Sequence, residues 1–266
     1  MGRLIILLAA VLVLVPARAA ELRLLAAELP PYTFQIPSAS VSEYPGPGQG
    51  VVYEVVQEMA KRVGHTGSIE FMPWTAAQQI AMTEPNVGIL ALTRTPERDP
   101  HYTWLVKVLT DDLILVGGLG VDVSTLDKVK NRPVGVLARS GAEALLKQKG
   151  FTRIEAAPEE WINARRLRER RIDAWLAPRL MVIYAYREVG GDPATLNIGE
   201  IVRPSEIWFA GSKSLPEAEV AKWKQAFEAI RQDGTYERIL SRYNRLKVIP
   251  VPDDLRRPDR EPVWVY

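Results

Sequence analysis

The segment 22–92 alternates between short apolar strands and amphipathic helices, and this order restricts the fold more than any other feature. The expected strands are 22–26, 69–72 and 87–92, and the expected helices are 51–63 and 74–83. The first helix carries apolar side chains at helical spacing and is followed by Gly64. Strand, helix, strand, helix, strand predicts a mixed α/β fold with parallel strands, whose ligands lie at the carboxyl ends of the strands.

A second unit of the same kind follows a β-rich stretch at 102–116, where we expect the chain to cross into a second lobe. A capped helix at 140–149 belongs to this second lobe, and an extended return at 198–210 leads into two closing helices. We therefore predict lobe 1 from residues 21–111 and 208–246, lobe 2 from residues 112–207, and a proline-rich C-terminal tail at 247–266.

The end of the strand at 87–92 carries groups suited to an anion. Thr93, Thr95 and Arg98 follow the apolar run, and Pro96 stands where a helix would begin. With Thr95 as N-cap and Pro96 at the first helical position, free backbone N–H groups would point beyond the strand. An arginine fork matches a carboxylate with two parallel hydrogen bonds. The alternative is that Arg98 only pairs with an acidic neighbour at the surface.

The N-terminus has the pattern of a secretory signal peptide. Arg3 precedes an apolar core at 4–15, and Ala17 and Ala19 form a small-x-small cleavage site. About 20 apolar residues would be needed to span a bilayer, so this core is too short for a membrane anchor. We expect a signal peptide at 1–20 that is cleaved after Ala19 or Ala20, and therefore a secreted protein. The absence of cysteine excludes a lipid-anchored form.

Charge and isolated histidines exclude several function classes. The chain has 34 basic and 32 acidic residues, and removal of Arg3 and Arg18 leaves 32 of each. A nucleic-acid binder would need a basic surplus, so nucleic acid is not an expected partner. His65 and His101 stand far from other candidate ligands, so we expect no metal site. No dinucleotide, Walker or G-x-S-x-G fingerprint is present, and we expect no cofactor.

The sequence T-R-T-P-E-R at 93–98 resembles the ligand-carboxylate motif of family 3 bacterial extracellular solute-binding proteins, the amino-acid type of periplasmic binding protein. Further landmarks agree in order and spacing from about residue 22 to 246, among them V-G-V-L-A-R-S-G-A-E at 134–143, R-R-I-D-A-W-L-A-P at 170–178 and D-G-T-Y-E-R-I-L-S-R-Y at 233–243. The resemblance implies the two-lobed type II fold, in which each lobe is a mostly parallel sheet flanked by helices and two crossings form a hinge.

The resemblance also implies a ligand site between the lobes. Arg98, Thr93 and Thr95 would hold the ligand carboxylate from lobe 1, and Ser140 and Gly141 would meet the same carboxylate from lobe 2 when the lobes close. Tyr32 is similar in position to an aromatic residue that packs on the ligand side chain, with a core aromatic as the alternative. Trp74 has a family counterpart near the cleft, although packing against the sheet is the alternative.

One departure from the family pattern concerns the ligand ammonium group. The family's α-amino-acid binders hold this group with an aspartate in the strand after the R-I-D-A-like turn, where this chain has Ala177 and Pro178. Val52 replaces a second aspartate that many members carry near Gly50. The ammonium site is therefore missing or rebuilt, with Glu28 as a candidate. An ordinary loop carboxylate is the alternative role for Glu28.

The leading functional prediction is a non-enzymatic periplasmic receptor. It would capture a small carboxylate-bearing solute, such as an amino acid, a derivative or another organic acid, for an ABC importer, and it would act as a monomer beside an inner-membrane permease. One alternative is an enzyme on the same fold, because cyclohexadienyl dehydratases resemble these binders, with Glu28 or Glu54 as the acid or base. Another alternative is a sensory or orphan binding protein, which the sequence does not separate from a transport receptor.

Overall fold

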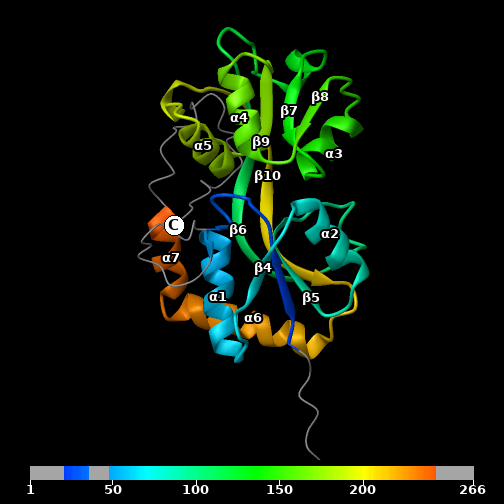
Figure 1. Ribbon diagram of the computed structural model, residues 1–266, viewed down its shortest axis with the longest axis vertical. Coiled ribbons are helices and arrows are strands. Elements are labelled where there is room, and N and C mark those ends of the chain that lie inside the picture. Colours follow the sequence, from blue (N-terminus) through cyan, green and yellow to red (C-terminus); the bar gives the residue numbers. More distant parts are fainter. Residues whose placement is uncertain (1–20, 36–47, 244–266) are drawn as a thin grey trace, which may run out of the picture.

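The computed structural model describes residues 21–35 and 48–243. The expected signal peptide with its cleavage site, most of the loop between Thr33 and Gln49, and the C-terminal tail lie outside these residues. The expected fold class is confirmed: the protein has two α/β lobes joined by two long strands (Figure 1). In the part that the structure describes, no helix is long and apolar enough to cross a membrane.

Lobe 1 is built on three parallel strands. The strand β1 (Arg23–Ala26) lies between β4 (Ile69–Phe71) and β5 (Val87–Thr93) and pairs with both in parallel. The helices α1 (Val51–Val63), α2 (Trp74–Thr83), α6 (Glu217–Gln232) and α7 (Thr235–Tyr243) complete this lobe. Their apolar faces share one core with the sheet, as the spacing in the sequence predicts. A short ladder of β2 (Phe34–Gln35) and β3 (Gly48–Gln49) lies beside α1.

Lobe 2 has a second group of parallel strands. The strand β7 (Val134–Leu137) pairs in parallel with β8 (Ile154–Ala157) and β9 (Ala174–Pro178). Three helices flank it, α3 (Gly141–Gln148), α4 (Glu160–Arg168) and α5 (Arg179–Glu188), and short 3-10 turns cover Leu126–Val129 and Pro193–Thr195. Two separate apolar clusters lie in this lobe. The edge strand β8 was not expected from the sequence, because exposed glutamate and alanine give it no apolar alternation.

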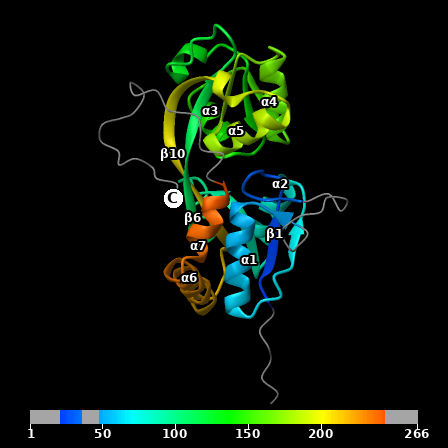
Figure 2. The same ribbon diagram turned by 90° about the vertical axis from the view of Figure 1, so that its left-hand side faces the viewer.

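Two strands of 16 residues, β6 (Tyr102–Gly117) and β10 (Asn197–Ser212), cross from one lobe to the other. They are antiparallel to each other, and they connect the two parallel groups into one sheet with the order β4-β1-β5-β10-β6-β9-β7-β8. Figure 2 shows both strands on one side of the molecule, with the lobes at their two ends. The lobe limits expected after residues 111 and 207 fall inside these strands, and we propose that the hinge lies there.

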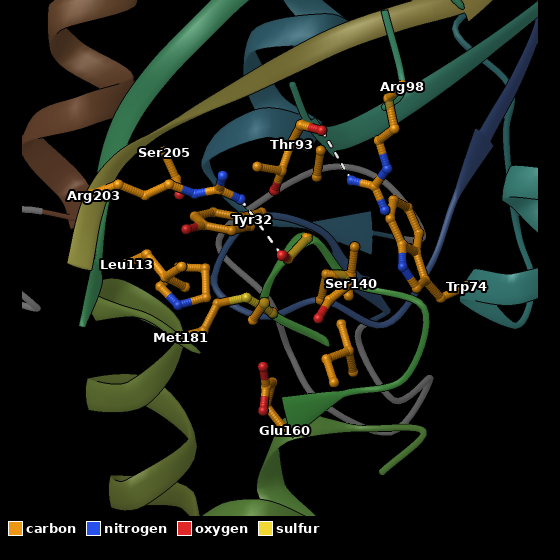
Figure 3. A pocket seen from close by; sticks show the side chains of 16 residues that line it. Tyr32, Trp74, Thr93, Arg98, Leu113, Ser140, Glu160, Met181, Arg203 and Ser205 are labelled. Carbon is orange, nitrogen blue, oxygen red and sulfur yellow. Dashed lines mark hydrogen bonds between the residues drawn. The ribbon is translucent and has the colours of Figure 1, made fainter. Parts of the chain in front are cut away.

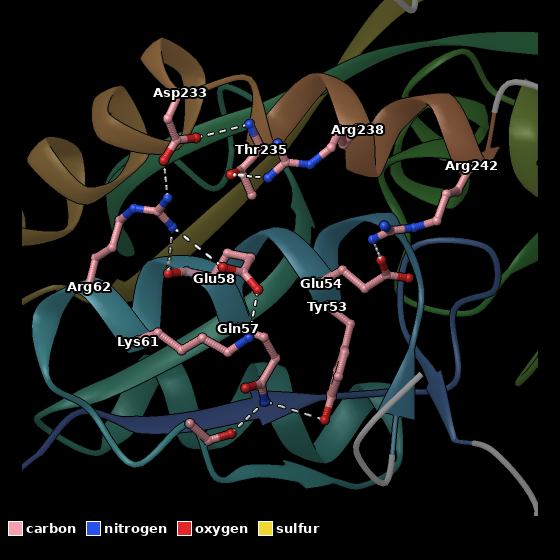
Figure 4. A network of polar contacts seen from close by, with 11 residues as sticks. Tyr53, Glu54, Gln57, Glu58, Lys61, Arg62, Asp233, Thr235, Arg238 and Arg242 are labelled. Atoms are coloured by element: carbon pink, nitrogen blue, oxygen red, sulfur yellow. Dashed lines mark hydrogen bonds and ion pairs between the residues drawn. The ribbon is translucent and has the colours of Figure 1, made fainter. Parts of the chain in front are cut away.

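Polar contacts fix the C-terminal helix α7 to α1. Arg242 pairs with Glu54, and the hydroxyl of Tyr243 donates to the same carboxylate (Figure 4 draws the Arg242 contact). At the other end Arg62 pairs with Asp233, which also accepts a hydrogen bond of 2.9 Å from the backbone N–H of Thr235. Glu54 therefore stabilises the packing of α7 within lobe 1, and this contact accounts for one of the two carboxylates considered as an acid or base.

The chain after β5 corrects one expectation. Residues 96–101 form turns and not a helix: the N–H groups of Arg98 and Asp99 donate to the carbonyl of Thr95 at 3.0 and 3.1 Å, and the N–H of His101 donates to the carbonyl of Arg98 at 2.9 Å. The reason is Pro100, which has no N–H and disfavours a helical conformation at the residue before it. Thr95 therefore opens one turn that carries Arg98, and no helix dipole acts at this point.

Candidate functional site

A small cavity of about 40 Å³ lies between the lobes at the ends of β5, β7 and β9. Its polar lining comes from Thr93, Arg98, Ser140, Arg203 and Ser205, with Glu160 at the lobe 2 end (Figure 3). One water needs about 10–15 Å³ of such space, so the cavity itself has room for about three waters. It is bordered by two larger pockets that share lining residues with it.

Arg98 crosses from lobe 1 to lobe 2. Its Nη1 donates to the carbonyl of Thr93 at 2.9 Å, and its Nη2 donates to Gln78 Oε1 at 3.0 Å and to the carbonyl of Arg139 at 2.9 Å. Arg139 belongs to lobe 2, where it has a left-handed φ of 55° that a non-glycine residue rarely adopts. All three bonds go to neutral acceptors. The Nε–H and one Nη1 proton of Arg98 have no partner among the described residues.

The charge of Arg98 is uncompensated at short range. No carboxylate of the described residues lies within 4.0 Å of its guanidinium, and the ring of Trp74 lies 6.0 Å from its Cζ. Burial lowers the pKa of Arg98 to about 10, so the side chain stays protonated at neutral pH. A buried cation without an ion partner is costly unless an anion joins it, and the cavity is where such an anion fits.

The start of α3 faces the same point from lobe 2. Ser140 is the N-cap, as the sequence predicts, and its Oγ accepts a hydrogen bond of 3.2 Å from the N–H of Glu143. A Cβ built on Gly141 would lie 3.1 Å from Cγ2 of Thr95 and 3.3 Å from Nη2 of Arg203. Because Thr95 belongs to lobe 1, glycine at this position allows the lobes to meet closely.

Tyr32 and Trp74 both line the cavity, and both are buried. The hydroxyl of Tyr32 donates to Asp111 at 2.6 Å, and the same carboxylate accepts the N–H of Leu180 at 3.0 Å. Burial raises the pKa of Asp111 to about 6. The indole N–H of Trp74 has no hydrogen-bond partner in the part of the chain that the structure describes. Tyr32 therefore packs in the core and also lines the cavity. The indole N–H of Trp74 is a hydrogen-bond donor at the cavity without a partner among the described residues.

Two expected site residues lie outside the cavity. Thr95 is buried under the start of α3 and lines an adjoining groove on the other side of Arg98. Glu28 is exposed and accepts the N–H of Gln35 at 3.1 Å. It lines an adjoining acidic and aromatic pocket with Phe34 and Tyr184, whose rings are 5.7 Å apart. This pocket shares Glu160 and Met181 with the cavity. The structure brings Thr93, Arg98, Ser140, Gly141, Tyr32 and Trp74 together, but not Glu28.

Glu160 and Arg203 are cavity residues that the sequence analysis missed. Glu160 is the first residue of α4, and its Oε2 accepts Asn163 Nδ2 at 3.0 Å and Trp175 Nε1 at 2.8 Å. Burial raises the pKa of Glu160 to about 7. Arg203 lies on β10, and its Nη2 is 3.4 Å from the carbonyl of Gly141. Pro178 also lines the cavity, so the position of the absent aspartate is apolar.

Metal binding has no support in the part of the chain that the structure describes. No group of three or more histidine, aspartate or glutamate side chains that could hold a metal ion occurs there. The titratable side chains that line the cavity are Arg98, Arg203, Glu160 and Tyr32.

Comparisons with known proteins identify the fold. No protein-family model and no curated protein sequence matches the chain. Among solved structures, it is similar to an ancestral arginine-binding protein bound to arginine (20% identity, 84% of this chain and 97% of that chain, TM-score 0.69). A substrate-binding protein of an amino acid ABC transporter is also similar (14%, 84% and 99%, 0.71), as is the ancestral amino-acid-binding protein AncCDT-1, a precursor of cyclohexadienyl dehydratase (16%, 83% and 94%, 0.67). At these identities the likeness shows a shared fold.

Proposed function

We propose that the protein is a solute-binding receptor of the family 3 type, which captures a small carboxylate-bearing solute between its lobes and delivers it to an ABC permease in the inner membrane. One observation carries this proposal above all. Arg98 presents an ion-unpaired guanidinium to a cavity formed by both lobes, opposite the N–H groups at the start of α3. A carboxylate fits both donors at once.

The same contacts explain why binding would close the lobes. A ligand that touches Arg98 in lobe 1 and Ser140 in lobe 2 interacts fully only when the lobes meet, so it favours the closed state over the open one. The similar structures support this reading, since one of them is a transporter's substrate-binding protein and another contains bound arginine. Secretion to the periplasm and a monomeric state belong to the same proposal.

The test is a thermal-shift screen of small organic acids and amino acids. A ligand present at a hundred times its dissociation constant adds about 2.7 kcal/mol of stability. In Arg98→Met the stabilisation should disappear, because removing one partner of a buried ion pair costs about 3 to 5 kcal/mol. The control is Arg153→Met, which removes an exposed arginine of lobe 2. Equal stabilisation of Arg98→Met and the wild type would refute the proposal.

Glu160 favours a second candidate function, an enzyme of the lyase type. A neutral carboxyl group with a pKa near 7 can protonate a leaving hydroxyl group, and Glu160 lies in the same cavity as the anion-binding groups. Mass spectrometry of each stabilising compound after incubation separates the two functions. A receptor leaves the compound unchanged, whereas a dehydratase-like enzyme converts it.

A further inference from the structure

The interlobe cavity contains a second guanidinium that one carboxylate cannot satisfy. Arg203 extends from β10 on the opposite side from Arg98, and both side chains point toward the start of α3 (Figure 3). The one hydrogen bond of Arg203 in the described structure is the long contact of 3.4 Å with the carbonyl of Gly141. Among the described residues, no carboxylate lies within 4.0 Å of Arg203.

The two arginines are close enough to repel each other. The pKa of Arg98 is lowered first by burial and also by the charge of Arg203, while the charge of Glu97 acts in the opposite direction. Glu97 lines the adjoining groove and not the cavity. Two like charges facing one small cavity are stable together only if negative charge lies between them. Within the lining, Glu160 is the only acidic side chain, and its carboxyl group already accepts hydrogen bonds from Asn163 and Trp175.

Charge balance then indicates the ligand. With Glu160 protonated the lining carries two positive charges, and with Glu160 ionised it carries one. By net charge a monocarboxylate also balances the second state, but Glu160 lies more than 4.0 Å from both guanidiniums and bonds to Asn163 and Trp175. A monocarboxylate or a neutral zwitterion therefore leaves one guanidinium without a carboxylate contact. A diacid balances the first state, and a diacid with an amino group balances the second. Both ligands carry two acidic groups.

We propose that the ligand is a small dicarboxylic acid, with one carboxylate on Arg98 and the start of α3 and the other on Arg203. This inference rests on the proposed function and specifies its substrate class. Hydroxyl groups of Thr93, Ser140 and Ser205 line the same cavity, and Trp74 offers an indole N–H without a partner among the described residues. These neutral donors suit carboxylate oxygens.

The experiment compares matched probes by isothermal titration calorimetry on the full mature chain. The pairs are succinate with butyrate and glutarate with valerate, with L-aspartate, L-glutamate and inorganic phosphate as further arms. We expect the diacids to bind at least about 30-fold more tightly than the monoacids, since an unpaired buried charge is costly. In Arg203→Gln this preference should fall to within about threefold, because diacid affinity falls much more than monoacid affinity.

Controls separate a binding role from a folding role. Arg203→Lys keeps the positive charge but loses the two parallel N–H donors of the guanidinium, and it should retain part of the preference for diacids. Arg153→Gln removes a charge from an exposed site of lobe 2 and should change nothing. The unfolding temperature of each variant without ligand reports whether it folds. The L-aspartate and L-glutamate titrations identify the type of diacid. If these amino diacids bind more tightly than succinate or glutarate, the ammonium group of the ligand contacts Glu160.

Three results would overturn the inference. If monoacids bind as tightly as diacids, or if Arg203→Gln leaves the diacid preference intact, the second carboxylate is not on Arg203 and the receptor function survives. If phosphate binds more tightly than every diacid, the ligand is a different dianion. If no acid binds, the proposed function fails and the inference fails with it.

Discussion

Closure of the lobes depends on the absence of a side chain at Gly141, and this gives the sharpest mutational prediction. The residue opens α3 in lobe 2, and an added Cβ would lie 3.1 Å from Thr95 of lobe 1, where ordinary contacts are 3.4 Å or longer. No positive φ is involved, so alanine or valine fits the backbone of α3 itself. A larger residue should therefore clash with lobe 1 in the closed state, raising the free energy of that state and leaving the open state unaffected.

The magnitude follows from the contact distances. Alanine requires Thr95 to shift by only a few tenths of an ångström, because the added atom is slightly too close. Valine adds two more methyl groups in the direction of lobe 1, and overpacking of this kind costs about 1–3 kcal/mol. If the cost falls on the closed state alone, Gly141→Val should weaken ligand binding by about 5- to 150-fold. Gly141→Ala should have a smaller effect in the same direction.

The assay combines titration calorimetry with small-angle X-ray scattering, using the acid that gives the largest thermal shift. Gly141→Val should bind more weakly and should remain more extended than the wild type at equal saturation. The control, Gln148→Val, places the same side chain at the exposed end of α3. If Gly141→Val binds with wild-type affinity and compacts to the same radius, Gly141 does not lie at a closing contact.

Further predictions concern stability in the absence of ligand. The raised pKa of Glu160, about 7 against an ordinary 4.5, means that its stabilising contribution is fully present below pH 4.5 and is lost as the pH rises to 7. The free energy of unfolding should fall by about 3 kcal/mol between pH 4.5 and 7 in the wild type. Urea unfolding of Glu160→Gln over the same pH range should not show this fall. Tyr32→Phe removes the hydroxyl that donates to the buried Asp111 and should cost about 1–3 kcal/mol, measured by the same unfolding experiment at pH 7. Ser140→Ala removes the cap that accepts the N–H of Glu143 and should cost about 1 kcal/mol by thermal unfolding; an unchanged melting temperature would contradict this role.

Much of the architecture could be predicted because burial leaves a periodic trace in the sequence. The helix at 51–63 and the strand at 87–92 are marked by apolar side chains at the spacing of their structures, and the cap at Ser140 is a local pattern. The spacing of apolar residues did not reveal β8, because this exposed edge strand does not alternate apolar and polar side chains. The sequence pattern also failed after Thr95, where the effect of Pro100 on the residue before it limits the chain to short turns.

The site was predictable where its residues belong to local motifs, which the family resemblance then brings together. Thr93 and Arg98 follow a single strand, so the sequence could bring them together. Arg203 and Glu160 join the cavity from β10 and α4, which are distant in sequence. One signal for Arg203 was available, a basic residue within the extended return segment at 198–210. Glu28 was a reasonable candidate by its place after β1, but the chain turns it toward Gln35 and away from the cavity.

A crystal structure of the protein with its best-stabilising acid would test the central claim most directly. We expect one ligand carboxylate within hydrogen-bond distance of both the Arg98 guanidinium and the N–H groups that open α3, with the lobes closed around it. A ligand held elsewhere, for example in the acidic pocket of Glu28 and Tyr184, with Arg98 bonded only to Thr93, Gln78 and Arg139, would contradict the account.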